Sequence, residues 1–237
     1  MTPFPGMFKT SSTEICRLRK SLYGLKQAPR AWFEKFRNTL LDFHFHQSNF
    51  DSSLFLHNTD VGIVILLVYV DDIVITGSDL DLIRKLQHHL HTTFRMKDLG
   101  MLQYFLGLEV QSCPSGSLLH QNKYTQEILT LAGLEHANST LTPLEVDLKL
   151  SKDEGTLLSD PSVYRQLVES LNYLTITRPD ISFDVQQVSQ YMHSPRDSHF
   201  TAVKRIARYL KGTCCRGLFF PINSSMKLTG LKIFYRI

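Results

Sequence analysis

The spacing of apolar residues predicts that the first part of the chain mixes helices and strands. Apolar side chains recur every three to four positions over 29–43 and over 79–94, which is typical of amphipathic helices. Between these two segments, Val, Ile and Leu dominate 61–76, and a shorter apolar run covers 53–57. Continuous apolar runs of this kind predict strands that are buried on both faces.

The middle of the chain carries weaker strand signals and one short helix. Strands are expected over 102–111 and 118–121, with a hairpin turn at Ser115-Gly116 between them. A helix is expected over 123–132. The polar segment 138–155 has no hydrophobic periodicity, so we expect it to be an irregular linker.

Three further helices are predicted after the linker. Asp and Ser accept hydrogen bonds from the first turn of a helix, and Pro fits its first position, so such residues mark helix starts. The expected starts are Asp160-Pro161, Arg178-Pro179-Asp180, and Asp197 or Ser198. The order of elements therefore predicts an α+β fold that becomes all-helical near residue 140.

The composition is that of a globular protein and not of a disordered chain. Of the 237 residues, 43% are hydrophobic and 20% are charged, which excludes wholesale disorder. The four cysteines have the spacing of neither a disulfide framework nor a zinc site, which fits a reducing compartment. The first residues do not resemble a signal peptide, and the longest apolar run, 61–70, is too short for a membrane helix. We therefore expect no membrane partner, and cytoplasmic localisation is the default.

Positive charge is concentrated in two clusters, although the net charge is only +4. The first cluster is Arg17, Arg19, Lys20, Lys26, Arg30, Lys35 and Arg37, and the second is Lys204, Arg205, Arg208 and Lys211. Two interpretations stay open for each cluster. It is either a surface that binds phosphate groups or the solvated face of an ordinary helix.

Two adjacent carboxylates, Asp71 and Asp72, interrupt the apolar run 61–76. A buried carboxylate without a partner is very costly, so these side chains lie at an exposed turn or are neutralised. Asp is common in turns, but no Gly or Asn stands beside the pair. The other interpretation is a site for Mg²⁺, which prefers hard oxygen ligands and serves phosphoryl transfer.

Motifs on both sides of the carboxylates carry a family resemblance. YVDDIVITGS is preceded by SLYGLKQAPRAWFEKF and followed by MKDLGMLQYFLGLEV, and then by KYTQEIL, YRQLVESLNYLTITRPDISFDVQQVSQYMHSP and AVKRIARYLKGT. This series, in this order, resembles the reverse transcriptase of copia-type LTR retrotransposons over about residues 3–227. The resemblance implies an RNA-directed DNA polymerase that acts with Mg²⁺ on an RNA or DNA primer–template and dNTP, within a larger Pol polyprotein.

The resemblance also implies a division of the chain. Residues 1–140 correspond to partial fingers and a polymerase palm, whose antiparallel sheet carries the YVDD hairpin and a hairpin that resembles the primer grip. Residues 141–227 correspond to an α-helical thumb and connection part, and residues 228–237 are a divergent tail where the family continues into RNase H.

Site residues follow from the same match. Asp71 and Asp72 correspond to the catalytic carboxylates that bind metal, and Tyr69 to the aromatic residue near the primer end and the incoming nucleotide. The other expected nucleotide and primer contacts are Lys26, Gln27, Arg30, Lys97 and Gly107. Simpler alternatives stay open for two of them: Gln27 caps the following helix, or Lys97 is an ordinary surface residue.

The sequence departs from the family at the metal site. Reverse transcriptases use three carboxylates, and the first lies in a segment resembling DVKNAFLHG, upstream of the stretch that this sequence matches. We therefore expect a truncated fragment with an incomplete site. The alternative function is a catalytically dead transposon remnant that only binds nucleic acid.

Overall fold

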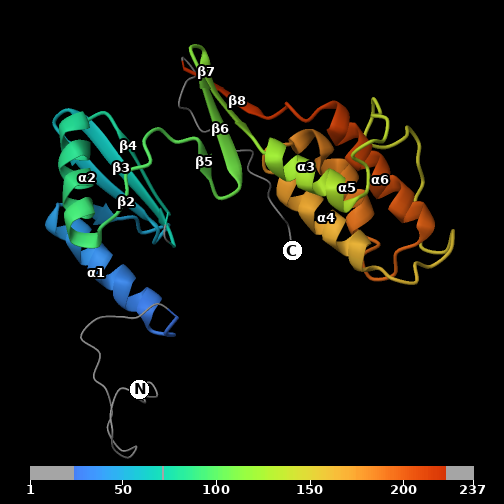
Figure 1. Ribbon diagram of the computed structural model, residues 1–237, viewed down its shortest axis with the longest axis horizontal. Helices are drawn as coiled ribbons and strands as arrows, with labels where there is room; N and C mark the ends of the chain where they lie inside the picture. The colour runs from blue at the N-terminus through green and yellow to red at the C-terminus, as the bar shows by residue number, and fades with distance from the viewer. Residues whose placement is uncertain (1–23, 71, 223–237) are drawn as a thin grey trace, which may run out of the picture. The chain divides into compact units, whose positions relative to one another are not determined.

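The computed structural model describes residues 24–70 and 72–222 (Figure 1). The chain divides into two compact units, the first over residues 1–100 and the second over residues 101–237. The boundary between the two units, at residue 100, lies earlier in the chain than the boundary near residue 140 that the sequence predicted. The strands after residue 103 form a sheet with a strand that follows the last helix, and so they belong to the second unit.

The first unit is an α+β unit with one antiparallel sheet. Its elements are α1 (Ala28–Asp42), β1 (His46–Gln47), β2 (Leu54–Thr59), β3 (Gly62–Tyr69), β4 (Asp72–Gly77) and α2 (Leu80–Phe94). The strands follow one another in the order β1-β2-β3-β4, and Figure 1 shows β2, β3 and β4 side by side. Both predicted helices and both predicted strand segments are confirmed. The Asp79 carboxylate caps α2 by accepting from the Leu82 backbone N–H at 2.9 Å.

Both helices of this unit cover the same face of its sheet. Val64, Leu66 and Val68 alternate along β3 and are buried, in one cluster with Phe36 of α1 and Leu86 of α2. The residues between them on β3 are partly or largely exposed. The prediction of strands buried on both faces is therefore wrong for this sheet within its own unit, because α1 and α2 pack on one side only.

The second unit combines a second antiparallel sheet with a helical bundle. Its elements are β5 (Tyr104–Phe105), β6 (Leu108–Cys113), β7 (Gly116–His120), α3 (Asn122–Leu131), α4 (Ser162–Leu174), the 3₁₀ turn η1 (Pro179–Ile181), α5 (Ser182–Ser189), α6 (Asp197–Gly212) and β8 (Leu218–Pro221). The sheet order is β5-β6-β7-β8. The strand predicted over 102–111 is in fact two strands that meet at a tight turn, and β8 was not predicted.

The bundle of the second unit has an apolar core of its own. Leu167 and Leu171 of α4, Val185 of α5, and Val203 and Ile206 of α6 are all fully buried in one cluster. All three predicted helices are confirmed, and 138–155 is irregular as expected. Among the described helices, none has the length and apolarity needed to cross a bilayer.

Candidate catalytic hairpin

Asp72, one of the two predicted carboxylates, lies at the hairpin between β3 and β4. Tyr69 pairs with Asp72 in the register, so the two strands meet at a tight turn that begins with Val70. Such turns favour a positive φ at their first central residue, and Val70 has φ 52°. Asp71 lies outside the described residues. For Asp72 the turn interpretation and the metal-site interpretation are therefore compatible, because an exposed turn can present a carboxylate to a metal ion.

The described side chains of the hairpin turn are exposed to solvent. Tyr69 is 53% exposed and Val70 is 70% exposed, and Asp72 is exposed as well. Residues paired across an antiparallel ladder share a face, so Tyr69 and Asp72 lie on the sheet face that α1 and α2 leave open. Within the described part of the chain, no side chain forms a hydrogen bond or ion pair with the Asp72 carboxylate.

These side chains suit a hard metal ion in their chemistry, although no complete cluster is present. Mg²⁺ takes carboxylate oxygens together with water and phosphate oxygens, and the accessible Asp72 carboxylate is such a ligand. Among residues 24–70 and 72–222, no group of three His, Cys, Asp or Glu side chains is placed to hold a metal ion.

Helix α1 brings its first residues to the hairpin end of the sheet. Phe33 and Phe36 contact Phe55, near the start of β2, with ring centroids 6.4 and 6.5 Å apart. Phe45, just after α1, instead contacts His57, two positions further from the hairpin. The helix therefore points its N-terminus toward the Tyr69–Asp72 end, and the expected nucleotide contacts Lys26, Gln27 and Arg30 lie there.

Helix α2 runs back toward the same end of the sheet, and Lys97 follows three residues after its last residue. The helix starts where β4 ends, far from the hairpin, and runs back until Phe94 packs on Trp32 and Phe36 near the start of α1. The segment that follows folds onto the helix, since the Met96 carbonyl bonds to the His91 ring at 2.6 Å. Lys97 is exposed in this segment.

The side chains at the start of α1 are accessible. Gln27 occupies the N-cap position, but its side chain makes no capping hydrogen bond, so the capping alternative is not supported. Arg30 forms an exposed ion pair with Glu34 at 3.0 Å, which is a weak interaction at the surface of a helix. Lys26 is exposed. All three side chains can therefore turn toward a ligand at little cost.

Gly107, the expected primer contact, lies in the second unit at the turn between β5 and β6. Leu106 and Gly107 both have positive φ, of 50° and 78°, as a tight two-residue hairpin requires. The Tyr173 hydroxyl donates a hydrogen bond to the Leu106 carbonyl, and a Cβ on Gly107 would lie 2.8 Å from that hydroxyl. The segment therefore forms a hairpin, as the family resemblance implied, and its tip is fixed by α4.

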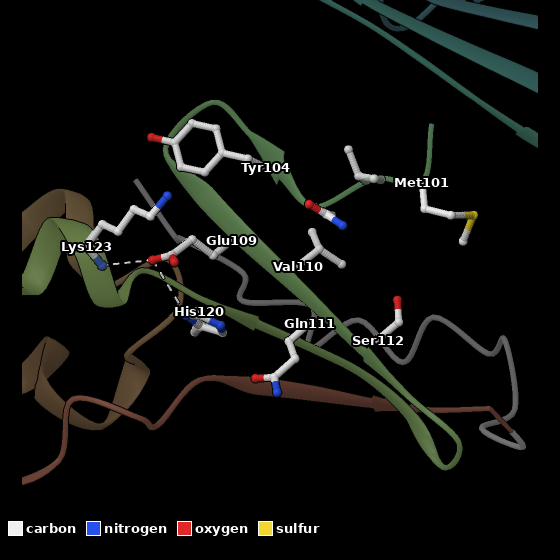
Figure 2. A pocket seen from close by; sticks show the side chains of 10 residues that line it. Met101, Tyr104, Glu109, Val110, Gln111, Ser112, His120 and Lys123 are labelled. Atoms are coloured by element: carbon white, nitrogen blue, oxygen red, sulfur yellow. Dashed lines mark hydrogen bonds and ion pairs between the residues drawn. The ribbon is translucent and has the colours of Figure 1, made fainter. Parts of the chain in front are cut away.

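A cavity of about 570 Å³ runs along this second hairpin (Figure 2). Figure 2 shows Tyr104, Glu109, His120 and Lys123 on its wall. The Glu109 carboxylate accepts from the Lys123 backbone N–H at 2.8 Å and lies 3.7 Å from His120 Nδ1. The Lys123 ammonium lies 5.5 Å from the centre of the Tyr104 ring. The carboxylate and the ammonium of this wall thus already have partners.

The second basic cluster has a structural role. Arg208 Nε donates to the Asn138 carbonyl at 2.8 Å, and Lys211 Nζ donates to the Ala137 carbonyl at 2.9 Å. Arg205 pairs with Glu145 at 3.0 Å, and Lys204 lies over the Phe200 ring. Arg205, Arg208 and Lys211 thus hold the irregular segment onto α6, whereas Lys204 packs on its own helix. The phosphate-binding interpretation is therefore not supported for this cluster.

The first basic cluster is only partly described, because Arg17, Arg19 and Lys20 lie outside the described residues. Within the described part, Arg37 Nε donates to Gln47 Oε1 at 2.8 Å, and Lys35 lies over the Phe94 ring. These two cations support α1, whereas Lys26 and Arg30 stay accessible.

Sequence reasoning missed the loop 48–53 as a part of this site. Its last residue, Ser53, accepts a hydrogen bond from the Val68 backbone N–H at 2.9 Å, one residue before Tyr69. The only sequence signal was the pattern Asp51-Ser52-Ser53, which is typical of a turn closed by an aspartate side chain. That pattern does not say which strand the turn will contact.

Comparisons with known proteins agree with the motifs. The family model described as reverse transcriptase (RNA-dependent DNA polymerase) matches residues 1–146. The chain is 44% identical to the retrovirus-related Pol polyprotein from transposon RE1 of Arabidopsis thaliana over 229 residues, which are 96% of this chain and 16% of the polyprotein.

Two other relatives belong to different hosts. The Pol polyprotein from transposon TNT 1-94 of Nicotiana tabacum is 40% identical over 84% of this chain and 16% of its own length. A putative transposon Ty5-1 protein of Saccharomyces cerevisiae is 30% identical over 91% of this chain and 70% of its own length.

The chain thus spans about a sixth of the Pol polyproteins that it matches. No solved structure matches it significantly. The family model covers more than half of the chain, and the matched polyproteins come from copia-type transposons. The chain belongs to the reverse transcriptase family of copia-type retrotransposon Pol polyproteins.

Proposed function

We propose that this chain carries the catalytic hairpin of an RNA-directed DNA polymerase. The observation that supports this most is the arrangement at one end of the first sheet. There, an exposed turn presents Tyr69 and Asp72, α1 begins beside Gln27, and α2 runs back toward the start of α1. In the proposed reaction, the 3′-hydroxyl of a primer attacks the α-phosphorus of a dNTP, a new phosphodiester bond forms, and pyrophosphate leaves.

Asp71 and Asp72 are proposed to hold Mg²⁺. Bound between two carboxylates and the phosphate oxygens, the ion would stabilise the charge that develops on the attacking and leaving oxygens. Asp72 contributes an accessible carboxylate beside a short turn that α1 and α2 do not cover. A third carboxylate, which the family uses, would come from a segment outside these 237 residues.

The remaining side chains are proposed to position the substrates. Tyr69 offers an exposed ring beside Asp72, on which the base or sugar at the primer end can pack. Lys26 and Arg30 are suited to the phosphates of the incoming dNTP, Gln27 to hydrogen bonding with it, and Lys97 to the leaving pyrophosphate. The β5–β6 hairpin around Gly107 is proposed to hold the primer strand.

These roles extend to the larger parts of the chain. We propose that residues 1–140 contain partial fingers, the palm and the primer-grip hairpin, and that residues 141–227 form the thumb and connection. Residues 228–237 are proposed to be a divergent tail. The partners would be an RNA or DNA primer–template, dNTP and the rest of the Pol polyprotein.

Primer extension on an RNA template tests the proposal. The purified chain is incubated with an RNA template, a DNA primer, dNTP and Mg²⁺, beside Asp72→Asn and Asp71→Asn/Asp72→Asn variants. We expect weak incorporation, because the third carboxylate is not among these residues, and its loss to background in both variants, since they remove charge stabilisation at the reacting phosphate. Asp60→Asn is the matched control, because Asp60 is an exposed aspartate in the turn at the opposite end of the same sheet.

Two results would contradict polymerase function. Incorporation that is equal in the wild type and the double variant would come from a contaminant. No incorporation, together with primer–template binding measured by fluorescence anisotropy, would instead support the alternative of a remnant that binds nucleic acid without chemistry.

A further inference from the structure

The loop 48–53 lies against the strand that leads into the catalytic hairpin. Leu54, at the start of β2, pairs with Leu67 in the register of β3. One step closer to the hairpin, the Ser53 carbonyl accepts the Val68 backbone N–H at 2.9 Å. Tyr69 follows immediately, and then the turn. Among the described residues, the last backbone hydrogen bond to β3 before the hairpin turn is therefore made by the loop and not by β2.

Asp51 fixes the position of that carbonyl. One oxygen of its carboxylate, Oδ1, accepts both the Ser53 backbone N–H at 2.8 Å and the Ser53 hydroxyl at 2.6 Å. The Asp51 carbonyl also accepts the Leu54 backbone N–H at 3.1 Å. The two bonds from Ser53 lower the pKa of the Asp51 carboxyl, so the side chain stays ionised at neutral pH and keeps its strength as an acceptor.

A second set of bonds ties the same loop to α1. Arg37 Nε donates to Gln47 Oε1 at 2.8 Å, and Gln47 Nε2 donates to the Ser52 carbonyl at 2.6 Å. The loop is therefore anchored on the helix at one side, locked internally by Asp51, and bonded to β3 at the other side. Every step is a hydrogen bond of ordinary length between described residues.

The hairpin needs such a support because its backbone is strained. Val70 is β-branched and has a positive φ of 52°, a conformation that persists only where neighbouring structure fixes it. Val70 itself is 70% exposed, so packing of its own side chain does not supply that constraint. The support comes from the β3–β4 ladder on one side and from the Ser53–Val68 bond on the other.

We infer that Asp51 is a positioning residue for the catalytic hairpin. Its carboxylate holds Ser53 so that the Ser53 carbonyl fixes Val68, and with it the direction in which Tyr69 projects. This inference rests on the proposed function for its catalytic meaning, whereas the structural brace is testable without any activity.

Hydrogen exchange at the Val68 amide tests the brace directly. We expect exchange at Val68 to be about fivefold faster in Asp51→Ala than in the wild type. A change of this size corresponds to loss of the Val68–Ser53 hydrogen bond. Asp51→Asn keeps the Oδ1 acceptor and should restore protection. Ser53→Ala loses only the hydroxyl bond and should have an intermediate effect. Asp60→Ala, at the other end of the sheet, is the matched control and should leave Val68 unchanged.

Primer extension by the same variants tests the catalytic meaning. Asp51→Ala should lower kcat and change the KM for dNTP less than about twofold, because the loop contacts no substrate in the proposed role. Asp51→Asn should recover most of the rate. The positioning role would be overturned if KM changed as much as kcat in Asp51→Ala and if Asp51→Asn recovered neither value.

The two readouts separate failure of the inference from failure of the proposed function. If the wild type extends no primer, the polymerase proposal fails, and the exchange experiment alone decides the brace. If Val68 exchange in Asp51→Ala equals that in the wild type while Trp32 fluorescence shows a folded unit, the brace is wrong whatever the activity. If Asp51→Ala does not fold, the milder Ser53→Ala variant carries the same test.

Discussion

At the scale of single residues, Val70 has a backbone conformation that its side chain strongly disfavours. A β-branched side chain at positive φ is a genuine outlier, and at 70% exposure Val70 gains little from burial in return. Such outliers gather at functional sites, where the surrounding structure imposes them. The conflict was invisible in the sequence, where Val70 looks like one more residue of an apolar strand.

Replacing Val70 with asparagine should therefore stabilise the first unit. Asn tolerates positive φ far better than Val, so we expect Val70→Asn to raise the free energy of unfolding by about 1 kcal/mol. Urea denaturation followed by fluorescence of Trp32 measures this, because it is the chain's one tryptophan and stacks on Phe36 in the core of this unit. A lower unfolding midpoint in the variant would show that the turn does not strain Val70.

Arg178 is a residue whose importance the sequence did not reveal. Only 2% of its surface is exposed. Its guanidinium forms two bonds of 2.8 Å with the Asp180 carboxylate and two with Thr213 after α6. Tyr209 donates to the same carboxylate at 2.9 Å. From the sequence, Arg178-Pro179-Asp180 is interpreted only as a helix start. In the structure, Arg178 joins that helix start to the end of α6.

Loss of this buried arginine should cost far more than loss of an exposed one. We expect Arg178→Ala to lower the unfolding free energy of the second unit by about 3 kcal/mol, because Asp180 and Thr213 lose a buried partner. Arg205→Ala breaks the more exposed pair with Glu145 and should cost less than about 1 kcal/mol. Urea denaturation followed by far-ultraviolet circular dichroism compares the two variants, and equal losses would refute the distinction.

At the scale of elements, periodicity and helix-start signals located every long helix and most strands. The failures have physical causes. The strand expected over 102–111 breaks because Leu106 takes a positive φ, which no local signal predicts for leucine. Strand β8 exists only because it pairs with β7, about a hundred residues earlier. Pairing over such a distance depends on the tertiary fold, and short strands carry too little local information to reveal it.

The start of α6 is an element whose contacts depend on one histidine. His199 is fully buried and stacks on Tyr191. Its Nδ1 accepts the Arg196 backbone N–H at 3.0 Å, so the hydrogen is on Nε2, which lies 2.9 Å from the Ser151 carbonyl. A neutral ring therefore fastens the linker to the helix. Burial is the main cause that lowers the pKa of His199. The hydrogen bond to the Ser151 carbonyl opposes it, Arg196 adds to the lowering, and Asp197 opposes it slightly.

The stability of the second unit should therefore fall in mild acid. The native pKa of His199 lies below the ordinary value of 6.5, so the unfolded chain binds a proton more readily than the native one. Stability is then full above about pH 6.5 and is lost as the pH falls toward the native pKa. Urea denaturation between about pH 7.5 and 5 measures this loss. His199→Gln keeps one acceptor and one donor but does not titrate, so the loss should shrink in this variant. An unchanged pH profile would contradict the role of His199.

At the scale of the whole molecule, the sequence predicted the hairpin, whereas the contacts divide the chain elsewhere than the sequence did. The apolar run with its two aspartates located the β3–β4 hairpin that carries Tyr69 and Asp72. The boundary near residue 140 followed from the change from mixed elements to helices alone. The contacts place the division at residue 100 instead, because β5–β7 pair with β8 and α3 packs in the helical core. The order of predicted elements reports the type of local structure, whereas a compact unit is defined by its own core.

The two separate cores predict two separate unfolding transitions. Leu86 is fully buried in the first core and Leu171 in the second, and replacing a buried leucine with alanine costs about 2–5 kcal/mol. Leu86→Ala should lower the unfolding midpoint seen by Trp32 fluorescence and leave the main helical transition seen by circular dichroism unchanged. Leu171→Ala should do the reverse, so each variant is the control for the other. If either substitution moves both transitions equally, the chain unfolds as one cooperative body and the division into two units has no thermodynamic meaning.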